Sequence, residues 1–138
     1  MSFIPTVAIR HLHAVVHGVD RLFQGGQVLR RYFAKANVAA SQTDSSVVAA
    51  VSAKEILVLG FRVMAGGTAT DITFNSKGAG AGVAISEAFQ CGANGGQAGA
   101  FSPVGHFKTV AGEALTVTTG AGSTVGVGVV YTLVEAES

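Results

Sequence analysis

The residues after position 45 form a series of short apolar or alternating segments separated by glycine-rich turns. Residues 55–64 are almost continuously aliphatic, aromatic or β-branched, which is typical of a strand covered on both faces. Residues 68–75, 114–118 and 124–134 instead alternate apolar side chains with polar or small ones, as half-buried strands do. We therefore predict an all-β fold, an antiparallel β-sandwich of the jelly-roll kind.

The last of these segments has two different faces. One face carries Gly126 and Gly128, where the missing side chains allow another backbone or an aromatic ring to approach closely. Such a face is suited either to an intermolecular contact or to packing inside the sandwich. The opposite face carries large apolar residues, which are Val125, Val127, Val129, Tyr131 and Leu133.

Charged side chains are scarce in this chain. They make up 12% of 138 residues, about half of the roughly 25% usual in soluble domains. So few charges cannot cover the whole surface of a free monomer, which indicates extensive contact with other chains. The single Cys91 excludes an intrachain disulfide and suits assembly in a reducing cytoplasm. No uncharged apolar run approaches the ~18 residues of a membrane-spanning helix, so we expect no membrane partner.

The sign of the charge changes along the chain. Residues 1–45 contain five Lys or Arg and two Asp, whereas residues 46–138 contain four Lys or Arg and six Asp or Glu. A basic segment before a mildly acidic body suggests an appendage that contacts an acidic surface. We predict an N-terminal assembly arm and linker over residues 1–45 and a β-sandwich domain over residues 46–138. The alternative is that the first segment forms a loosely attached face of the same domain.

The pattern within the predicted arm is weak. Val15, Val19 and Leu22-Phe23 have roughly helical spacing, and Gly25-Gly26 would end such a helix. Residues 28–33 are compatible with a strand or a helical turn, and as a strand they could complete the sandwich at its edge. The small and polar residues 36–46 resemble a linker.

Two arginines in the predicted arm precede two aromatic residues. Arginine pairs with carboxylates and stacks on rings, so this run could engage an acidic partner while burying apolar area beside it. The run is too short for a nucleic-acid surface, which would interleave a larger basic face with aromatics. The predicted interface residues are Arg30, Arg31, Tyr32, Phe33, Gly126 and Gly128.

No catalytic constellation emerges from the sequence. Asp71, Glu87 and Glu113 are the carboxylates of the body that could serve glycoside hydrolysis, but nothing in their spacing marks a pair. The glycine-rich residues 78–83 lack the GK[ST] ending and the following helix of a phosphate loop, and are interpreted as a flexible turn. We expect no enzymatic activity and no cofactor.

A metal site is also not expected. His11, His13 and His17 could place two imidazoles on one face of a strand or a helix. No further histidine, cysteine or carboxylate follows at a matching spacing.

Three motifs resemble those of a known family. They are VVAAVSAKEILV at residues 47–58, CGANGGQAGAFSPVGHFKT at residues 91–109, and AGEALTV at residues 111–117. In this order and spacing, the segment from Val48 to Val134 resembles a β-rich module of small virion proteins of tailed bacteriophages. The motif residues have structural explanations: Asn94 and the following glycines suit a tight turn, and Phe101 and Phe107 suit the end of a sandwich.

The resemblance implies a non-enzymatic virion protein, most simply a capsid decoration (cement) protein on the outside of a tailed-phage head. It would be made in the host cytoplasm and bind the major capsid protein or another virion protein. Low charge and capsid symmetry suggest a homo-oligomer, with a trimer as the first expectation. The alternative is a head-fibre, neck or tail-tip component that acts as an interaction or glycan-binding module.

Overall fold

A computed structural model of the chain describes residues 21–24 and 27–136, which fall into two compact units with a boundary after Arg31. In the first unit, β1 (Arg21–Gln24) pairs with β2 (Gln27–Arg30) as an antiparallel hairpin. The helix expected here is wrong at Leu22 and Phe23, which belong to β1. Val15 and Val19 lie outside the described residues. A Gly-Gly pair between two short apolar segments is a hairpin signal, and here it competes with the helical spacing.

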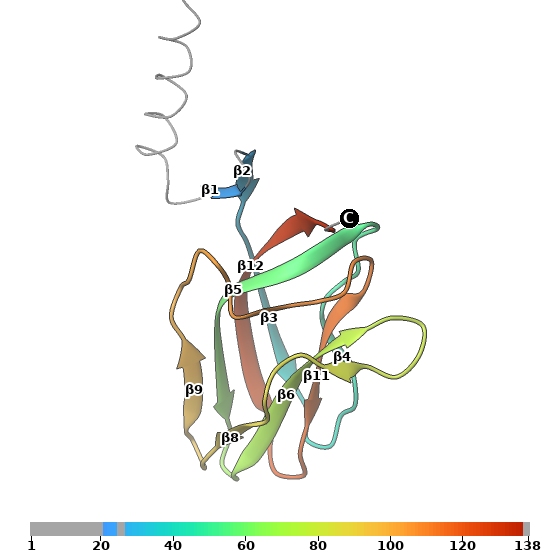
Figure 1. Ribbon diagram of the computed structural model, residues 1–138. Coiled ribbons are helices and arrows are strands. Elements are labelled where there is room, and N and C mark those ends of the chain that lie inside the picture. Colours follow the sequence, from blue (N-terminus) through green and yellow to red (C-terminus); the bar gives the residue numbers. More distant parts are fainter. Residues whose placement is uncertain (1–20, 25–26, 137–138) are drawn as a thin grey trace, which may run out of the picture. The chain divides into compact units, whose positions relative to one another are not determined.

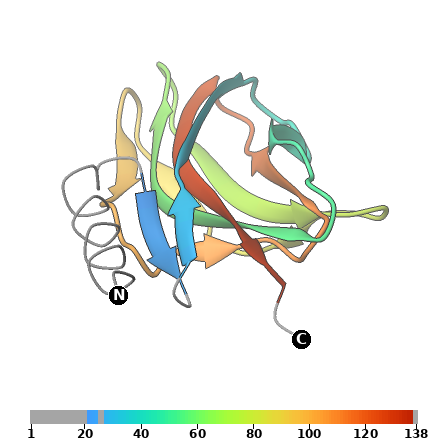
Figure 2. The same cartoon turned by 90° about the horizontal axis from the view of Figure 1, so that it is seen from above.

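The second unit consists of two five-stranded antiparallel sheets that lie face to face (Figure 1, Figure 2). We name them the β12 sheet and the β6 sheet after a central strand of each. In the β12 sheet the order is β10 (Phe107–Lys108), β5 (Lys54–Ala65), β12 (Val125–Glu135) and β3 (Tyr32–Val38), and β9 (Gly96–Gly99) also pairs with β5. In the β6 sheet it is β4 (Ser45–Val48), β11 (Ala114–Thr119), β6 (Thr70–Lys77) and β7 (Val83–Ala84), and β8 (Phe89–Cys91) also pairs with β6.

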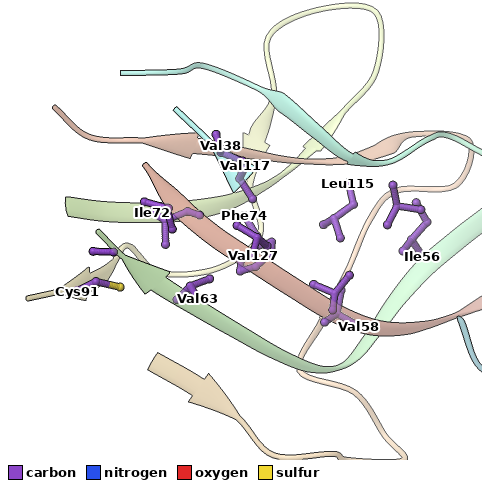
Figure 3. Close-up of a cluster of buried hydrophobic side chains, with 14 residues drawn as sticks. Val38, Ile56, Val58, Val63, Ile72, Phe74, Cys91, Leu115, Val117 and Val127 are labelled. Atoms are coloured by element: carbon purple, nitrogen blue, oxygen red, sulfur yellow. The ribbon is translucent and has the colours of Figure 1, made fainter. Parts of the chain in front are cut away.

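The core of this unit is built from the inward face of both sheets. Figure 3 shows Phe74 and Val127 in its middle, with Cys91 and Ile72 toward one end and Ile56 toward the other. These side chains are buried, and aromatic rings close in around one of them. Phe74 has ring centroids at 4.9 Å from Phe107, 5.8 Å from Phe61 and 6.2 Å from Phe89.

The all-β prediction is confirmed for the described residues, among which no helix occurs. The four segments expected as strands correspond to β5, β6, β11 and β12. Coverage of β5 on both faces holds at Leu59, which is fully buried. It is wrong farther along, where Arg62 and Met64 are exposed on the outer side of the β12 sheet. Here the exposed Arg62 and Met64 alternate with the inward Phe61 and Val63. The overall apolar character of the segment hides this alternation in the sequence.

The predicted boundary at residue 45 is wrong. β3 pairs with β12 over its whole length, from Tyr32 opposite Tyr131 to Val38 opposite Val125. Residues 36–46 are therefore not a linker, because they finish β3, cross between the sheets and begin β4. The alternative of an edge strand is confirmed for Tyr32 and Phe33, which begin β3 at the edge of the β12 sheet. The rest of β3 resembled a linker because its inward residues Ala34 and Ala36, which pack against the core, are small. Whether residues 1–31 serve as an assembly arm stays a prediction.

The motif residues hold turns and strand ends. Asn94 has a φ of 56° and Gly105 one of 83°, so both occupy the left-handed region that their residue types tolerate. Phe107 packs against the core as expected, whereas Phe101 is 49% exposed. Glu113 Oε1 accepts a hydrogen bond from the Ser76 hydroxyl at 2.7 Å, and the same hydroxyl accepts one from the Val110 amide at 2.9 Å.

Candidate interaction surface

The outer face of the β12 sheet is set by the alternation of its central strands. Val125, Val127 and Val129 point into the core, so Gly126 and Gly128 face outward with Val130. The interpretation that the two glycines pack inside the sandwich is therefore wrong. They expose the backbone of a central strand on the outside of the sheet.

Strand register places a row of side chains on either side of this bare strand. Gly126 lies between Asn37 of β3 and Met64 of β5. Gly128 lies in the same way between Lys35 and Arg62. The next outward position, Val130, lies between Phe33 and Gly60. The result is a trough whose floor is β12 and whose walls come from β3 and β5.

The trough comprises two hollows that share Lys35 and Arg62 in their walls. One has a volume of about 790 Å³ and extends over Gly126 toward β9. The other, of about 620 Å³, extends over Gly128 toward Phe33 and Phe101. Both are open to solvent rather than enclosed, so they are suited to a chain segment or a surface and not to a sequestered small molecule.

The two glycines on the floor of the trough differ in whether a side chain would fit in their place. A Cβ at position 128 would lie 3.0 Å from Nε of Arg62, because the arginine side chain lies across Gly128. A Cβ at position 126 would have Asn37 Oδ1 as its nearest described neighbour, at 3.6 Å, which is an ordinary contact. Gly126 also has no left-handed φ. Among the residues that the structure describes, nothing requires a glycine there, although glycine weakens a strand interior.

The trough is positively charged. Its lining contains Lys35 and Arg62 and no carboxylate. Within residues 29–136, neither cation makes an ion pair, since the two salt bridges found there join Lys54 to Glu135 and Lys108 to Glu55. Large apolar side chains border the cations, with Phe33 73% exposed and Met64 61% exposed. The face therefore combines apolar area with unneutralised positive charge.

The boundary between the two compact units divides the arginine-aromatic run, with Arg30 and Arg31 in the first unit and Tyr32 and Phe33 in the second. Arg30 ends β2 and Tyr32 begins β3. Within β3, neighbouring residues point to opposite sides, so Phe33 faces the trough while the ring of Tyr32 stacks on Tyr131 at 5.4 Å. Arg31 lies between the two strands. Of the predicted interface residues, the structure brings Phe33, Gly126 and Gly128 together.

Sequence reasoning missed the walls of the trough. Lys35, Asn37, Arg62 and Met64 became relevant only through the pairing of β3 and β5 with β12. The signal available was the alternation of these residues with small or apolar ones. That pattern indicates an outward face but not which strands lie side by side.

The glycine-rich residues 78–83 are held against the β6 sheet. Asp44 Oδ2 accepts a hydrogen bond from the Gly82 amide at 2.9 Å, and Asp44 Oδ1 accepts from Asn75 Nδ2 at 3.1 Å and Thr116 Oγ1 at 3.2 Å. A Cβ on Gly82 would lie 2.0 Å from Asp44 Oδ1, so glycine is needed for this approach. The segment is thus a turn fixed by a carboxylate.

Two of the three carboxylates that could serve glycoside hydrolysis, Asp71 and Glu113, lie far apart. Asp71 and Ser76 are both on β6, and Glu113 is bound to Ser76. A strand rises about 3.3 Å per residue, so Asp71 is about 16 Å from the Glu113 contact. Paired glycosidase carboxyls are about 5 to 9.5 Å apart. This pair therefore does not have that arrangement.

Two further groups have perturbed acidity. Burial raises the pKa of the Cys91 thiol above 9.0, and the negative charge of Asp71 adds to the effect. Burial likewise raises the pKa of the Tyr131 hydroxyl above 10.0.

In the described parts of the chain, no three His, Cys, Asp or Glu gather as a metal site, and no helix there is long and apolar enough to cross a bilayer. His11, His13 and His17 lie outside those parts.

No protein-family model, no curated protein and no solved structure matches this chain.

Proposed function

We propose that this chain is a non-enzymatic virion structural protein, a decoration (cement) protein that binds the outside of a tailed-phage head and stabilises contacts between capsomers. The observation that carries the proposal is the trough on the β12 sheet. A central strand with an outer backbone bare at Gly126 and covered at Gly128 only by the Arg62 side chain, bordered by exposed apolar side chains, is suited to close contact with another protein surface. The resemblance of the three sequence motifs to virion proteins of tailed phages is the reason for naming a phage head as the particle.

A jelly-roll topology is part of this proposal. Its support is the strand order, with β3, β12, β5 and β10 in one sheet and β4, β11, β6 and β7 in the other. Successive strands alternate between the sheets at β3, β4, β5 and β6, and again at β10, β11 and β12. Jelly rolls are frequent among viral structural proteins.

The second candidate is a head-fibre, neck or tail-tip component. The observation that favours it is the exposure of Asn94 and Phe101 on either side of β9, which offers an amide and a ring to a ligand. The two candidates differ in where the protein is attached and in what it contacts.

Particles purified from the source of this sequence test the proposal. Mass spectrometry of the virions should detect the chain in many copies, and antibody labelling should decorate the head. The purified protein should also co-sediment with heads that lack it. Absence of the chain from the virion would contradict the proposal, and labelling confined to the tail would replace it with the second candidate.

A further inference from the structure

We infer that the trough binds an extended acidic segment of the partner protein, with one carboxylate held between Lys35 and Arg62. This inference rests on the proposed function, because it names the chemistry of the partner at the same assembly surface. Three features of the described residues carry it: the spacing of the two cations, the absence of acids in the lining, and the glycine floor between the walls.

The two cations are placed to share one carboxylate. Lys35 and Arg62 are both register partners of Gly128, one from each neighbouring strand. Two strand spacings put their backbones about 10 Å apart. Their long side chains can close this gap over a glycine, where no Cβ intervenes. Arginine offers a planar pair of donors to the two carboxylate oxygens, and lysine adds a second charged donor.

Charge selects an acidic partner. The linings of both hollows lack Asp and Glu, and neither cation is neutralised by another described residue. An approaching carboxylate therefore meets no like charge in the lining of the trough. A basic segment would be repelled by the same two groups.

The spacing of the outward positions along β12 determines which side chains of the bound segment lie on either side of its carboxylate. Outward positions on β12 are two residues apart, and side chains on one face of an extended segment repeat at the same interval. A segment lying along β12 with its acidic residue over Gly128 puts its residues at −2 and +2 over Gly126 and Val130. Met64 borders the first position and Phe33 the second. The preferred pattern is apolar, any residue, acidic, any residue, apolar.

A synthetic seven-residue peptide tests this pattern directly. It has glutamate in the centre and leucine two positions to each side, and matched peptides carry glutamine or lysine in the centre. Titration of the full isotope-labelled chain, followed by amide NMR shifts, should show the glutamate peptide perturbing Gly126, Gly128 and Arg62. The glutamine peptide should bind at least about tenfold more weakly. Equal binding of these two peptides, or shifts confined to the β6 sheet, would overturn the inference.

Charge-matched variants locate the effect. The double variant Lys35→Gln/Arg62→Gln should lose the preference for glutamate over glutamine. The control Lys77→Gln/Lys108→Gln removes the same charge elsewhere and should keep it. Loss of the preference in both doubles would show general electrostatic attraction and overturn the proposed contact. Thermal melting of each variant checks that the fold is retained.

Head binding separates this inference from the proposed function. If heads bind the wild type and the Lys35→Gln/Arg62→Gln variant equally, the carboxylate contact is wrong while the decoration role stands. If heads bind neither protein but the peptide preference holds, the decoration role is wrong and the chemistry of the trough stands. Binding of heads by the wild type with at least about tenfold loss in the double variant supports both.

Discussion

Replacing Gly126 by valine should stabilise the isolated protein and abolish its binding to particles. The nearest described neighbour of a new Cβ at this position is Asn37 Oδ1 at 3.6 Å, and the remaining side chain would extend into the open trough. Glycine in a strand interior costs about 0.5–1 kcal/mol, and valine adds β-propensity on a scale that spans about 1 kcal/mol. We expect a gain of about 1 kcal/mol, which raises the Tm of a chain of this size by about 4 °C.

Gly96→Val is the matched control, because this glycine lies in the same row but close to a neighbouring backbone. A Cβ there would lie 2.1 Å from the Val63 carbonyl oxygen, so the strands must move apart, at a cost of about 1–3 kcal/mol. Thermal melting and urea titration at an unchanged m-value measure both effects. If Gly126→Val lowers the free energy of unfolding by more than about 1 kcal/mol, the fold itself requires this glycine. That result would refute the account in which the glycine serves contact with a partner.

Four further predictions concern the rest of the chain. Asp44→Ala should lower stability by about 1–3 kcal/mol, measured by urea unfolding, since it leaves the partly buried Gly82 amide and Thr116 hydroxyl without this acceptor; an unchanged midpoint would contradict this role. The buried Cys91 should react slowly with a thiol reagent until the protein is unfolded, and fast labelling of the native protein would count against this. Because the pKa of the Cys91 thiol is raised in the folded protein, the free energy of unfolding should be full below pH 9.0 and fall above it, and it should fall less in Cys91→Ala. Deletion of residues 1–31 should leave a cooperative unfolding transition, whereas deletion of residues 1–45 removes β3 and should abolish it; equal melting of the two truncations would show that β3 is dispensable. Light scattering should find a homo-oligomer, with a trimer as our first expectation, and a clean 13.9 kDa monomer at micromolar concentration would argue against it.

The strands that the sequence predicts well are those with a strong apolar period. Residues 124–134 alternate large valines with glycines, and the observed core and outer faces follow that alternation. Most of β3, from Ala34 to Val38, was predicted as a linker for a physical reason. Its inward residues Ala34 and Ala36 are small, so they carry little hydrophobic signal, and in the structure they are half-buried against the core beside β12.

The candidate surface was predictable only in part. Gly126 and Gly128 stand out in the sequence because two glycines on one face of an apolar strand are unusual. Lys35 and Arg62 do not stand out, since they are 27 positions apart in the numbering of the chain and meet only through their common pairing with Gly128. Register between strands depends on turns and tertiary packing that local patterns do not encode.

Cryo-electron microscopy of the parent virion, at a resolution that traces the strands, tests the central claim most directly. The account predicts density for this chain on the outside of the head, with the outer face of the β12 sheet against a neighbouring protein and an acidic side chain between Lys35 and Arg62. Density in which that face is open to solvent while the β6 sheet makes the contacts would contradict it.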